Sequence, residues 1–342
     1  MADVIIHRQG VAGRITLNRP SALHALNEEM CLAMDAALIA WRDDPEIELV
    51  VIDHADGTRG FCAGGDIRML AESGAADSSA AMAFFAAEYR LNARIKNYPK
   101  PYVAFMDGVT MGGGVGISVH GSHRVATERT NFAMPETGIG LFPDVGGGWF
   151  LPRLGPPLGM WLALTGERLK GGDVVAAGIG THFVEAAVTG VVKDSICEGG
   201  LALLDAMDWD ETATFETYID AIQRCFWKPG VEEIFAALEE EGGEWAARQL
   251  ATLKTKSPQT LKVAHRQLAL GLHARTFEDN MRMEFRIGSR VVSRHDFQEG
   301  VRAIIIDKDN APAWNPATLS GVTDEMLDEI FAPLDGGELQ FD

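Results

Sequence analysis

The sequence predicts an α/β fold in which strands and helices alternate, followed by a helical C-terminal region. Short apolar runs suit buried strands and lie before about residue 135, namely Ile47–Asp53, which is rich in β-branched residues, and Tyr102–Met106. Stretches of helical composition separate these runs, as crossovers between parallel strands require. From Leu158 onward helix signals dominate, apart from a short strand-like segment at Thr181–Val184.

The N-terminal elements can be placed in order along the chain. Val4–Arg8 and Arg14–Asn18 are typical of a hairpin across a glycine-containing turn. Asn27 suits the N-cap of a helix running to about Arg42, because the two glutamates after it lie favourably against the helix dipole. Ala80–Asn97 has helical composition.

Three later positions mark further helix starts. The glycine cluster Gly112–Gly116 opens one helix, and Ser257 before Pro258 is the expected N-cap of another. Asp296 is expected to cap a third. Since no linker composition separates the C-terminal part, we expect one domain over residues 1–342, with an α/β core at about 1–200 and a helical region at 201–342.

Length and composition are those of a globular enzyme. Of the 342 residues, 46% are apolar and 23% charged, and no apolar run approaches the roughly 20 residues of a membrane-spanning helix. The net charge of −19 argues against nucleic acid or an anionic membrane as a partner, since both need a concentrated basic face. The four cysteines include no CxxC pair, and a strand follows Met1 without room for a targeting segment. We therefore expect free thiols and a cytoplasmic location.

Two glycine-rich loops are suited to close approach of a ligand to the backbone. Residues 61–66, Phe-Cys-Ala-Gly-Gly-Asp, follow a buried strand and precede a helix. In the second loop, Gly112–Gly114 open a helix at a cost of about 1 kcal/mol per glycine relative to alanine. Taken alone, the first loop also fits a plain tight turn and the second fits close helix packing. The second has neither the spacing of a dinucleotide-binding fingerprint nor that of a P-loop.

A third loop places two carboxylates, Glu136 and Asp144, among glycine and apolar residues. Buried carboxylates that lie close together have their pKa values split, which divides acid and base roles between them. The plainer interpretation is a loop glutamate and an aspartate that caps the next helix. Cys62 has no histidine near it in sequence, so packing is its expected role. The nine histidines form no H-x-x-x-H or H-x-H pair, and no metal site is expected.

In combination these segments resemble the crotonase (enoyl-CoA hydratase/isomerase) superfamily over nearly the whole chain. The resemblance is carried, in order and spacing, by Leu17-Asn18-Arg19-Pro20, Ala25-Leu26-Asn27, Phe61-Cys62-Ala63-Gly64-Gly65-Asp66-Ile67, Gly112–Gly114 and Pro135-Glu136. It implies a spiral fold of ββα units and an acyl-coenzyme A substrate, with coenzyme A as part of the substrate and no other cofactor. It also implies a homo-oligomer.

The resemblance implies roles for particular residues. The backbone N–H groups of Ala63 and Gly113 would form an oxyanion hole for the thioester carbonyl. The loop that contains Gly64 and Asp66 would lie along coenzyme A, and Gly112 would line the substrate site beside Gly113.

Within the superfamily the chain resembles the 3-hydroxyisobutyryl-CoA hydrolases, thioesterases of valine catabolism. Gly116 occupies the position of one of the two hydratase glutamates, and Asp144 stands where a hydratase usually has glycine. By this resemblance Glu88 and Asp144 line the acyl pocket, and Glu136 acts on the carbonyl or on water. Glu136 as general base and Glu136 as nucleophile both remain open. An enoyl-CoA hydratase or isomerase that uses Glu136 with Asp144 is the alternative, and a non-enzymatic coenzyme A-binding scaffold is a third possibility.

Overall fold

The computed structural model describes residues 2–207 and 213–341, which divide into two compact units. Unit 1 comprises Met1–Gly65, Ala87–Ala133 and Arg168–Glu216. Unit 2 comprises Asp66–Ala86, Met134–Glu167 and Thr217–Asp342. The units therefore interleave along the sequence instead of dividing near residue 200. A single domain over the whole chain remains a prediction.

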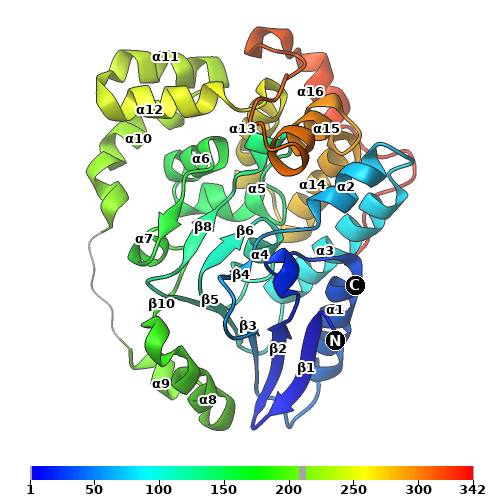
Figure 1. The fold of residues 1–342 in the computed structure, drawn as a ribbon, viewed down its shortest axis with the longest axis vertical. Coiled ribbons are helices and arrows are strands. Elements are labelled where there is room, and N and C mark those ends of the chain that lie inside the picture. The colour runs from blue at the N-terminus through cyan, green and yellow to red at the C-terminus, as the bar shows by residue number, and fades with distance from the viewer. Residues whose placement is uncertain (1, 208–212, 342) are drawn as a thin grey trace. The chain divides into compact units, whose positions relative to one another are not determined.

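Unit 1 contains two sheets, and their strands alternate along the chain (Figure 1). The first sheet has the order β1 (Val4–Gln9), β2 (Ala12–Leu17), β3 (Leu49–His54), β5 (Tyr102–Met106), β7 (His123–Ala126) and β10 (His182–Phe183). The second has the order β4 (Gly60–Cys62), β6 (Val109–Met111), β8 (Asn131–Ala133) and β9 (Leu169–Lys170). In each of the pairs β3/β4, β5/β6 and β7/β8, one strand belongs to the first sheet and the next strand to the second sheet. Within the first sheet β3, β5 and β7 are parallel, and within the second β4, β6 and β8 are parallel. This is the repeating spiral that the family resemblance predicts.

Helices cover the first sheet of unit 1 through an apolar interface. The helices of this unit are α1 (Glu28–Arg42), the second part of α3 (Ser79–Lys96), α4 (Gly113–Gly116), α7 (Gly172–Ala176), α8 (Thr189–Gly199) and α9 (Ala202–Asp205). Val192 and Ile196 of α8 belong to one buried cluster with Val51, Phe105 and Val125 of the strands. Burial of such side chains stabilises by about 1.5–3 kcal/mol each, which holds α8 on the sheet.

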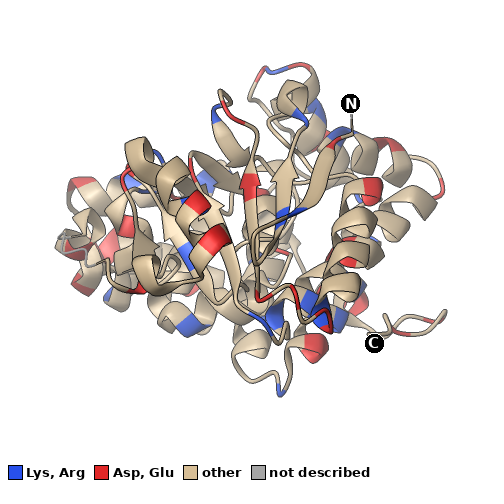
Figure 2. Ribbon diagram, turned by 90° about the horizontal axis from the view of Figure 1, so that it is seen from below, with Lys and Arg blue, Asp and Glu red and all other residues tan. Residues whose placement is uncertain are grey.

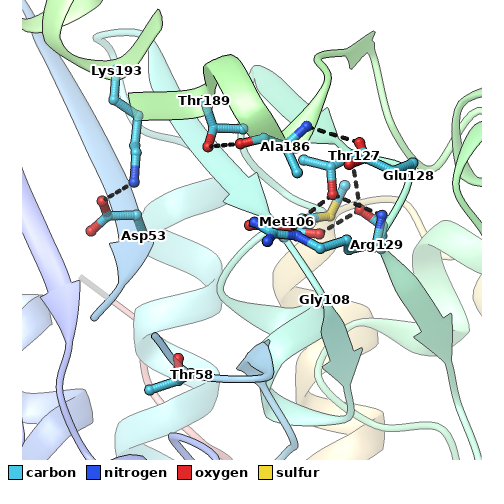
Figure 3. A network of polar contacts seen from close by, with 12 residues as sticks. Asp53, Thr58, Met106, Gly108, Thr127, Glu128, Arg129, Ala186, Thr189 and Lys193 are labelled. Atoms are coloured by element: carbon cyan, nitrogen blue, oxygen red, sulfur yellow. Dashed lines mark hydrogen bonds and ion pairs between the residues drawn. The ribbon is translucent and has the colours of Figure 1, made fainter. Parts of the chain in front are cut away.

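Buried carboxylates also fasten unit 1 at the ends of its strands (Figure 3). Asp53 of β3 accepts from Lys193 Nζ on α8 at 2.9 Å and from Thr16 Oγ1 on β2 at 2.7 Å. Asp107, directly after β5, accepts from Thr127 Oγ1 at 2.7 Å and from Arg129 Nε at 2.8 Å. These bonds tie neighbouring strands together at their carboxyl ends.

Unit 2 consists mainly of helices. They are α2 (Ile67–Gly74), the first part of α3, α5 (Gly147–Phe150), α6 (Pro156–Thr165), α10 (Ile219–Phe226), α11 (Val231–Glu241), α12 (Gly243–Lys254), α13 (Pro258–Leu272), α14 (Phe277–Val291), α15 (His295–Val301) and α16 (Asp324–Phe331). Short 3-10 segments include Glu136–Ile139. Helices α11 and α12 run side by side in Figure 1. The expectation of a helical C-terminal region is confirmed.

Two of the three capping predictions are confirmed. Asn27 Oδ1 accepts from Met30 N at 2.9 Å, and Ser257 Oγ accepts from Thr260 N at 3.1 Å. The prediction for Asp296 is wrong, because Arg294 is the N-cap of α15 and Asp296 lies inside the helix. Its carboxylate instead accepts from Ser257 Oγ at 2.5 Å and from Asn315 N at 2.7 Å.

Charged residues are spread along the described chain rather than confined to one element. Asp and Glu are interspersed with Lys and Arg on many of the helices (Figure 2). Acidic residues number 49 and basic residues 30, which gives the net charge of −19. None of the helices in the described ranges has both the length and the apolar composition needed to span a bilayer.

Candidate active site

The loop after β4 in unit 1 is held by hydrogen bonds that leave one backbone N–H group open. The Ala63 N–H donates to Leu23 O at 3.0 Å, and the Leu26 N–H donates to Gly64 O at 2.8 Å. The Ala63 N–H is therefore occupied, which is at odds with its expected role as an oxyanion donor. For the Gly65 N–H, by contrast, residues 2–207 and 213–341 provide no hydrogen-bond partner.

A second open N–H group lies on the adjoining turn. Gly113 is the first residue of α4, so its N–H has no acceptor within the helix, and none is found elsewhere in the described part of the chain. Gly112 before it has a φ of +47°, a conformation that side-chain-bearing residues rarely adopt. A Cβ at Gly113 would lie 3.3 Å from the carbonyl carbon of Gly64, so the turns of Gly65 and Gly113 are adjacent.

Glu88 of α3 lies against the same turn. Its side chain is 1% exposed, and a Cβ at Gly113 would lie only 2.4 Å from Glu88 Oε1. The glycine at this position is thus required by the close approach of a carboxyl group to the backbone. Unit 1 brings Glu88, Gly64, Gly112 and Gly113 together.

Glu136 begins the 3-10 segment of unit 2 and is 4% exposed. Burial, and then the charge of Asp144, raise the pKa of Glu136 well above its ordinary value, while Lys256 acts in the opposite direction. In the chain as described, Glu136 Oε2 has no hydrogen-bond partner. A buried carboxylate with an open oxygen and a raised pKa is suited to accept a proton from water or to attack a carbonyl carbon.

Asp144 lies in the segment Pro143–Gly148 and is 5% exposed. It is not a helix cap, because α5 begins at Gly147 and its N-cap is Gly146. Asp66, expected along coenzyme A, caps α2, where its Oδ1 accepts from Met69 N at 3.3 Å. Unit 2 therefore contributes two buried, electrostatically coupled carboxylates, Glu136 and Asp144.

Lys256 is a residue that sequence reasoning missed. Its Nζ would lie 3.3 Å from a Cβ at Gly138, within the segment that carries Glu136. Burial lowers the pKa of Lys256, and Glu136 opposes that change. Nothing in the sequence marks this lysine, because it is 120 residues from Glu136 and follows an ordinary helix.

Cys62 is placed for packing. It is fully buried, its Sγ donates to His24 O at 3.1 Å, and burial raises the pKa of the thiol to about 12. The thiol is therefore not poised as a nucleophile. Within the described ranges, no group of three His, Cys, Asp or Glu side chains is placed to hold a metal ion.

Comparison with known proteins decides the family. Residues 12–331 match the family model described as enoyl-CoA hydratase/isomerase. The chain belongs to this family. Two solved structures of the family confirm the expected crotonase-like α/β fold. A carnitinyl-CoA dehydratase from Mycobacterium thermoresistibile has a TM-score of 0.95 at 37% identity and covers 100% of this chain and 99% of its own. An enoyl-CoA hydratase from Rhodobacter sphaeroides 2.4.1 has a TM-score of 0.93 at 41% identity, over 99% of this chain and 100% of its own.

Relatives within the family share more of the sequence. The 3-hydroxyisobutyryl-CoA hydrolase of Mus musculus is 46% identical over 99% of this chain and 91% of its own length. The Homo sapiens protein of the same name is 45% identical over the same shares. These similarities confirm the resemblance to 3-hydroxyisobutyryl-CoA hydrolases. Both relatives are named mitochondrial, which overturns the expectation of a cytoplasmic location.

Proposed function

We propose that this chain hydrolyses the thioester of 3-hydroxyisobutyryl-CoA to 3-hydroxyisobutyrate and free coenzyme A. The observation that carries the proposal is 45–46% identity over 99% of the chain to hydrolases of that name. Glu136 and Asp144, the two carboxylates to which the resemblance gives roles in hydrolysis, are both buried, which supports the same conclusion. A role in valine catabolism follows from this substrate and is part of the proposal.

The N–H groups of Gly65 and Gly113 bind the thioester oxygen and stabilise the negative charge that develops on it. Gly65 takes this role in place of Ala63, since the Ala63 N–H is bound to Leu23 O. A donor of this kind contributes on the order of 2.7–4 kcal/mol to the transition state. Two adjacent donors suit a tetrahedral oxyanion.

Glu136 supplies the hydrolytic step. As a general base it removes a proton from water, whose oxygen then attacks the carbonyl carbon and expels the coenzyme A thiolate. As a nucleophile it forms a mixed anhydride that water opens in a second step. In both routes the oxygen of water ends in the acid product, and the expelled thiolate takes up a proton that comes from the same water, carried by Glu136 in the general-base route.

Asp144 binds the 3-hydroxyl group of the acyl chain, and Glu88 is assigned to the acyl part of the substrate. A buried hydroxyl without a partner would cost about 1–3 kcal/mol, so a site that provides one selects substrates that carry it. Gly64, Gly112 and Asp66 are assigned to the coenzyme A part of the substrate. Assembly as a homo-oligomer remains a prediction from the family.

The second candidate is the hydratase or isomerase reaction, in which an enoyl-CoA is hydrated or, in reverse, a 3-hydroxyacyl-CoA is dehydrated. It is favoured by the solved structures, which are titled carnitinyl-CoA dehydratase and enoyl-CoA hydratase. Against it stands Gly116, which lies where a hydratase carries its second glutamate.

The proposal is tested by measuring the release of free thiol from two thioesters, one with the 3-hydroxyl group and one without it. We expect kcat/KM for 3-hydroxyisobutyryl-CoA to exceed that for isobutyryl-CoA by at least about 100-fold, because the second ester lacks the hydroxyl group that Asp144 binds. Equal rates on the two esters would remove hydroxyl recognition and leave a generic acyl-CoA thioesterase.

A further inference from the structure

A third buried carboxylate, Glu284 of α14, lies at the centre of a hydrogen-bond network in unit 2. Its side chain is 0% exposed. Glu284 Oε2 accepts from Gly146 N at 2.7 Å, and Oε1 accepts from Gly148 N at 2.9 Å. Oε1 also accepts from Gln267 Nε2 at 3.0 Å and from Asn280 Nδ2 at 2.8 Å. The bonds from Gly146, Gly148 and Asn280 favour the ionised form of the carboxyl group and lower its pKa, against the larger effect of burial, which raises it.

The chain makes this network at a cost. No Lys, Arg or His of the described ranges lies within ion-pair distance of Glu284, and burial raises its pKa to about 8. Gln267 Oε1 and Asn280 Oδ1 are buried and have no hydrogen-bond partner in the part of the chain that the structure describes. Each buried unsatisfied acceptor costs about 1–3 kcal/mol. An apolar core would avoid these costs, so the network calls for an explanation.

The bonds of the network bracket Asp144 on both sides. Gln267 Nε2 also donates to Pro143 O at 2.7 Å, on the N-terminal side of Asp144. Gly146 N and Gly148 N are held on its C-terminal side. Within this bracket Val145 has a φ of +50°, a strained conformation for a β-branched residue that persists only where its surroundings enforce it.

Close packing prevents the bracketed segment from shifting. A Cβ at Gly148 would lie 2.6 Å from Asn280 Oδ1, and a Cβ at Gly271 would lie 1.9 Å from Gly148 O. The segment 143–148 is thus pressed against α13 and α14 and fixed by hydrogen bonds at three backbone positions.

We infer that Glu284 is a positioning residue that sets where the Asp144 carboxylate meets the substrate. The inference rests on the proposed function, in which Asp144 binds the 3-hydroxyl group. Glu284 does not touch the substrate. It fixes the backbone after Asp144, and Gln267 extends the same network to the backbone before it. Productive binding of a hydroxyl depends on sub-ångström placement of its partner, so loosening this support weakens hydroxyl recognition specifically.

The Glu284→Gln variant tests this role selectively. An amide can keep the three bonds at Oε1, but its NH2 then faces the Gly146 N–H, and the bond beside Asp144 is lost. We expect kcat/KM for 3-hydroxyisobutyryl-CoA to fall about 30-fold and that for isobutyryl-CoA less than about threefold. In an Asp144→Ala background, Glu284→Gln should lower either value less than about threefold, since coupled residues are non-additive.

Two further variants separate positioning from folding. Glu284→Asp keeps the carboxyl group on a shorter side chain, and we expect an intermediate loss with the same ester selectivity. Gln249→Met removes the buried bond from Trp161 Nε1 to Gln249 Oε1 (2.9 Å) elsewhere in unit 2, and should lower Tm without changing the ester preference. Equal loss on both esters, or equal loss with and without Asp144, would overturn the inference alone. A wild-type chain that releases no thiol from either ester would overturn the proposed function, and this inference with it.

Discussion

Two glycine runs, Gly112–Gly114 in unit 1 and Gly146–Gly148 in unit 2, have the same composition and open short helices in the same way. In the first, the Gly113 N–H has no partner among the described residues. In the second, the N–H groups of Gly146 and Gly148 are both bound by Glu284. A glycine run offers N–H groups to a ligand only where the protein does not supply its own acceptor.

The reason for glycine also differs between the runs. At Gly113 a Cβ would meet the Glu88 carboxyl oxygen, and at Gly148 it would meet the Asn280 amide oxygen. The first run packs against Glu88, a candidate substrate-binding residue, and the second run packs against Asn280, a member of the internal hydrogen-bond network. The comparison assigns chemistry to the first run and positioning to the second, and the following variants test that division.

The largest effect is expected for Glu136→Gln, and the losses of kcat in the variants of the two glycine runs are compared with it. We expect kcat to fall by about 1000-fold or more while the Kd for the acyl-CoA stays within about tenfold, because the amide keeps the shape and removes the basicity. Steady-state thiol release and equilibrium binding of the ester measure the two quantities. Retention of most of the rate would exclude Glu136 as the catalytic group.

Gly113→Ala should lower kcat by about 100-fold, since the added Cβ displaces the N–H that stabilises the oxyanion. Gly148→Ala is the matched control in the second run. Its Cβ also strikes a buried oxygen, so we expect a lower Tm but a loss of kcat no greater than about tenfold. If Gly148→Ala impairs kcat as much as Gly113→Ala does, the division between the runs is wrong.

Lys256→Met should move the acidic limb of the pH–rate profile. Burial and Asp144 raise the pKa of Glu136, and Lys256 lowers it. The base is active when ionised, so removing Lys256 shifts the limb to higher pH and slows the enzyme a few-fold near neutral pH. A limb that moves to lower pH, or not at all, would show that Lys256 does not act on Glu136.

The smallest effect is expected for Cys62→Ser. A thiol with a pKa of about 12 holds almost no thiolate at neutral pH, and a serine hydroxyl can donate to His24 O as the thiol does. Activity within about threefold of wild type is the expected result. Near-complete inactivation of a folded variant, or an acyl group trapped on Cys62, would contradict the assignment of hydrolysis to a carboxylate.

Local signals explain what the sequence predicts well. The apolar run Tyr102–Met106 coincides with β5, and Asn27 and Ser257 cap helices as their side chains allow. Asp296 was misassigned because its carboxylate bonds Ser257 Oγ and Asn315 N, which are brought to it by tertiary structure. Capping preferences cannot anticipate such distant partners.

The same limit applies to the candidate site. Glu136 and Asp144 stand out because two carboxylates in an apolar loop are unusual. The choice between Ala63 and Gly65 depends on one hydrogen bond, from Ala63 N to Leu23 O, that no local pattern reveals. Glu284 lies 138 residues from Gly146 and was not identified from the sequence, since a glutamate within a helix ordinarily faces water.

The most direct measurement uses one substrate and two readouts. Incubation of the wild-type chain with 3-hydroxyisobutyryl-CoA is followed for free thiol and for absorbance of the conjugated enoyl thioester that dehydration would form. Hydrolysis predicts one thiol released per ester consumed, with no rise in enoyl absorbance. Enoyl absorbance without free thiol would contradict the account and identify the chain as a dehydratase.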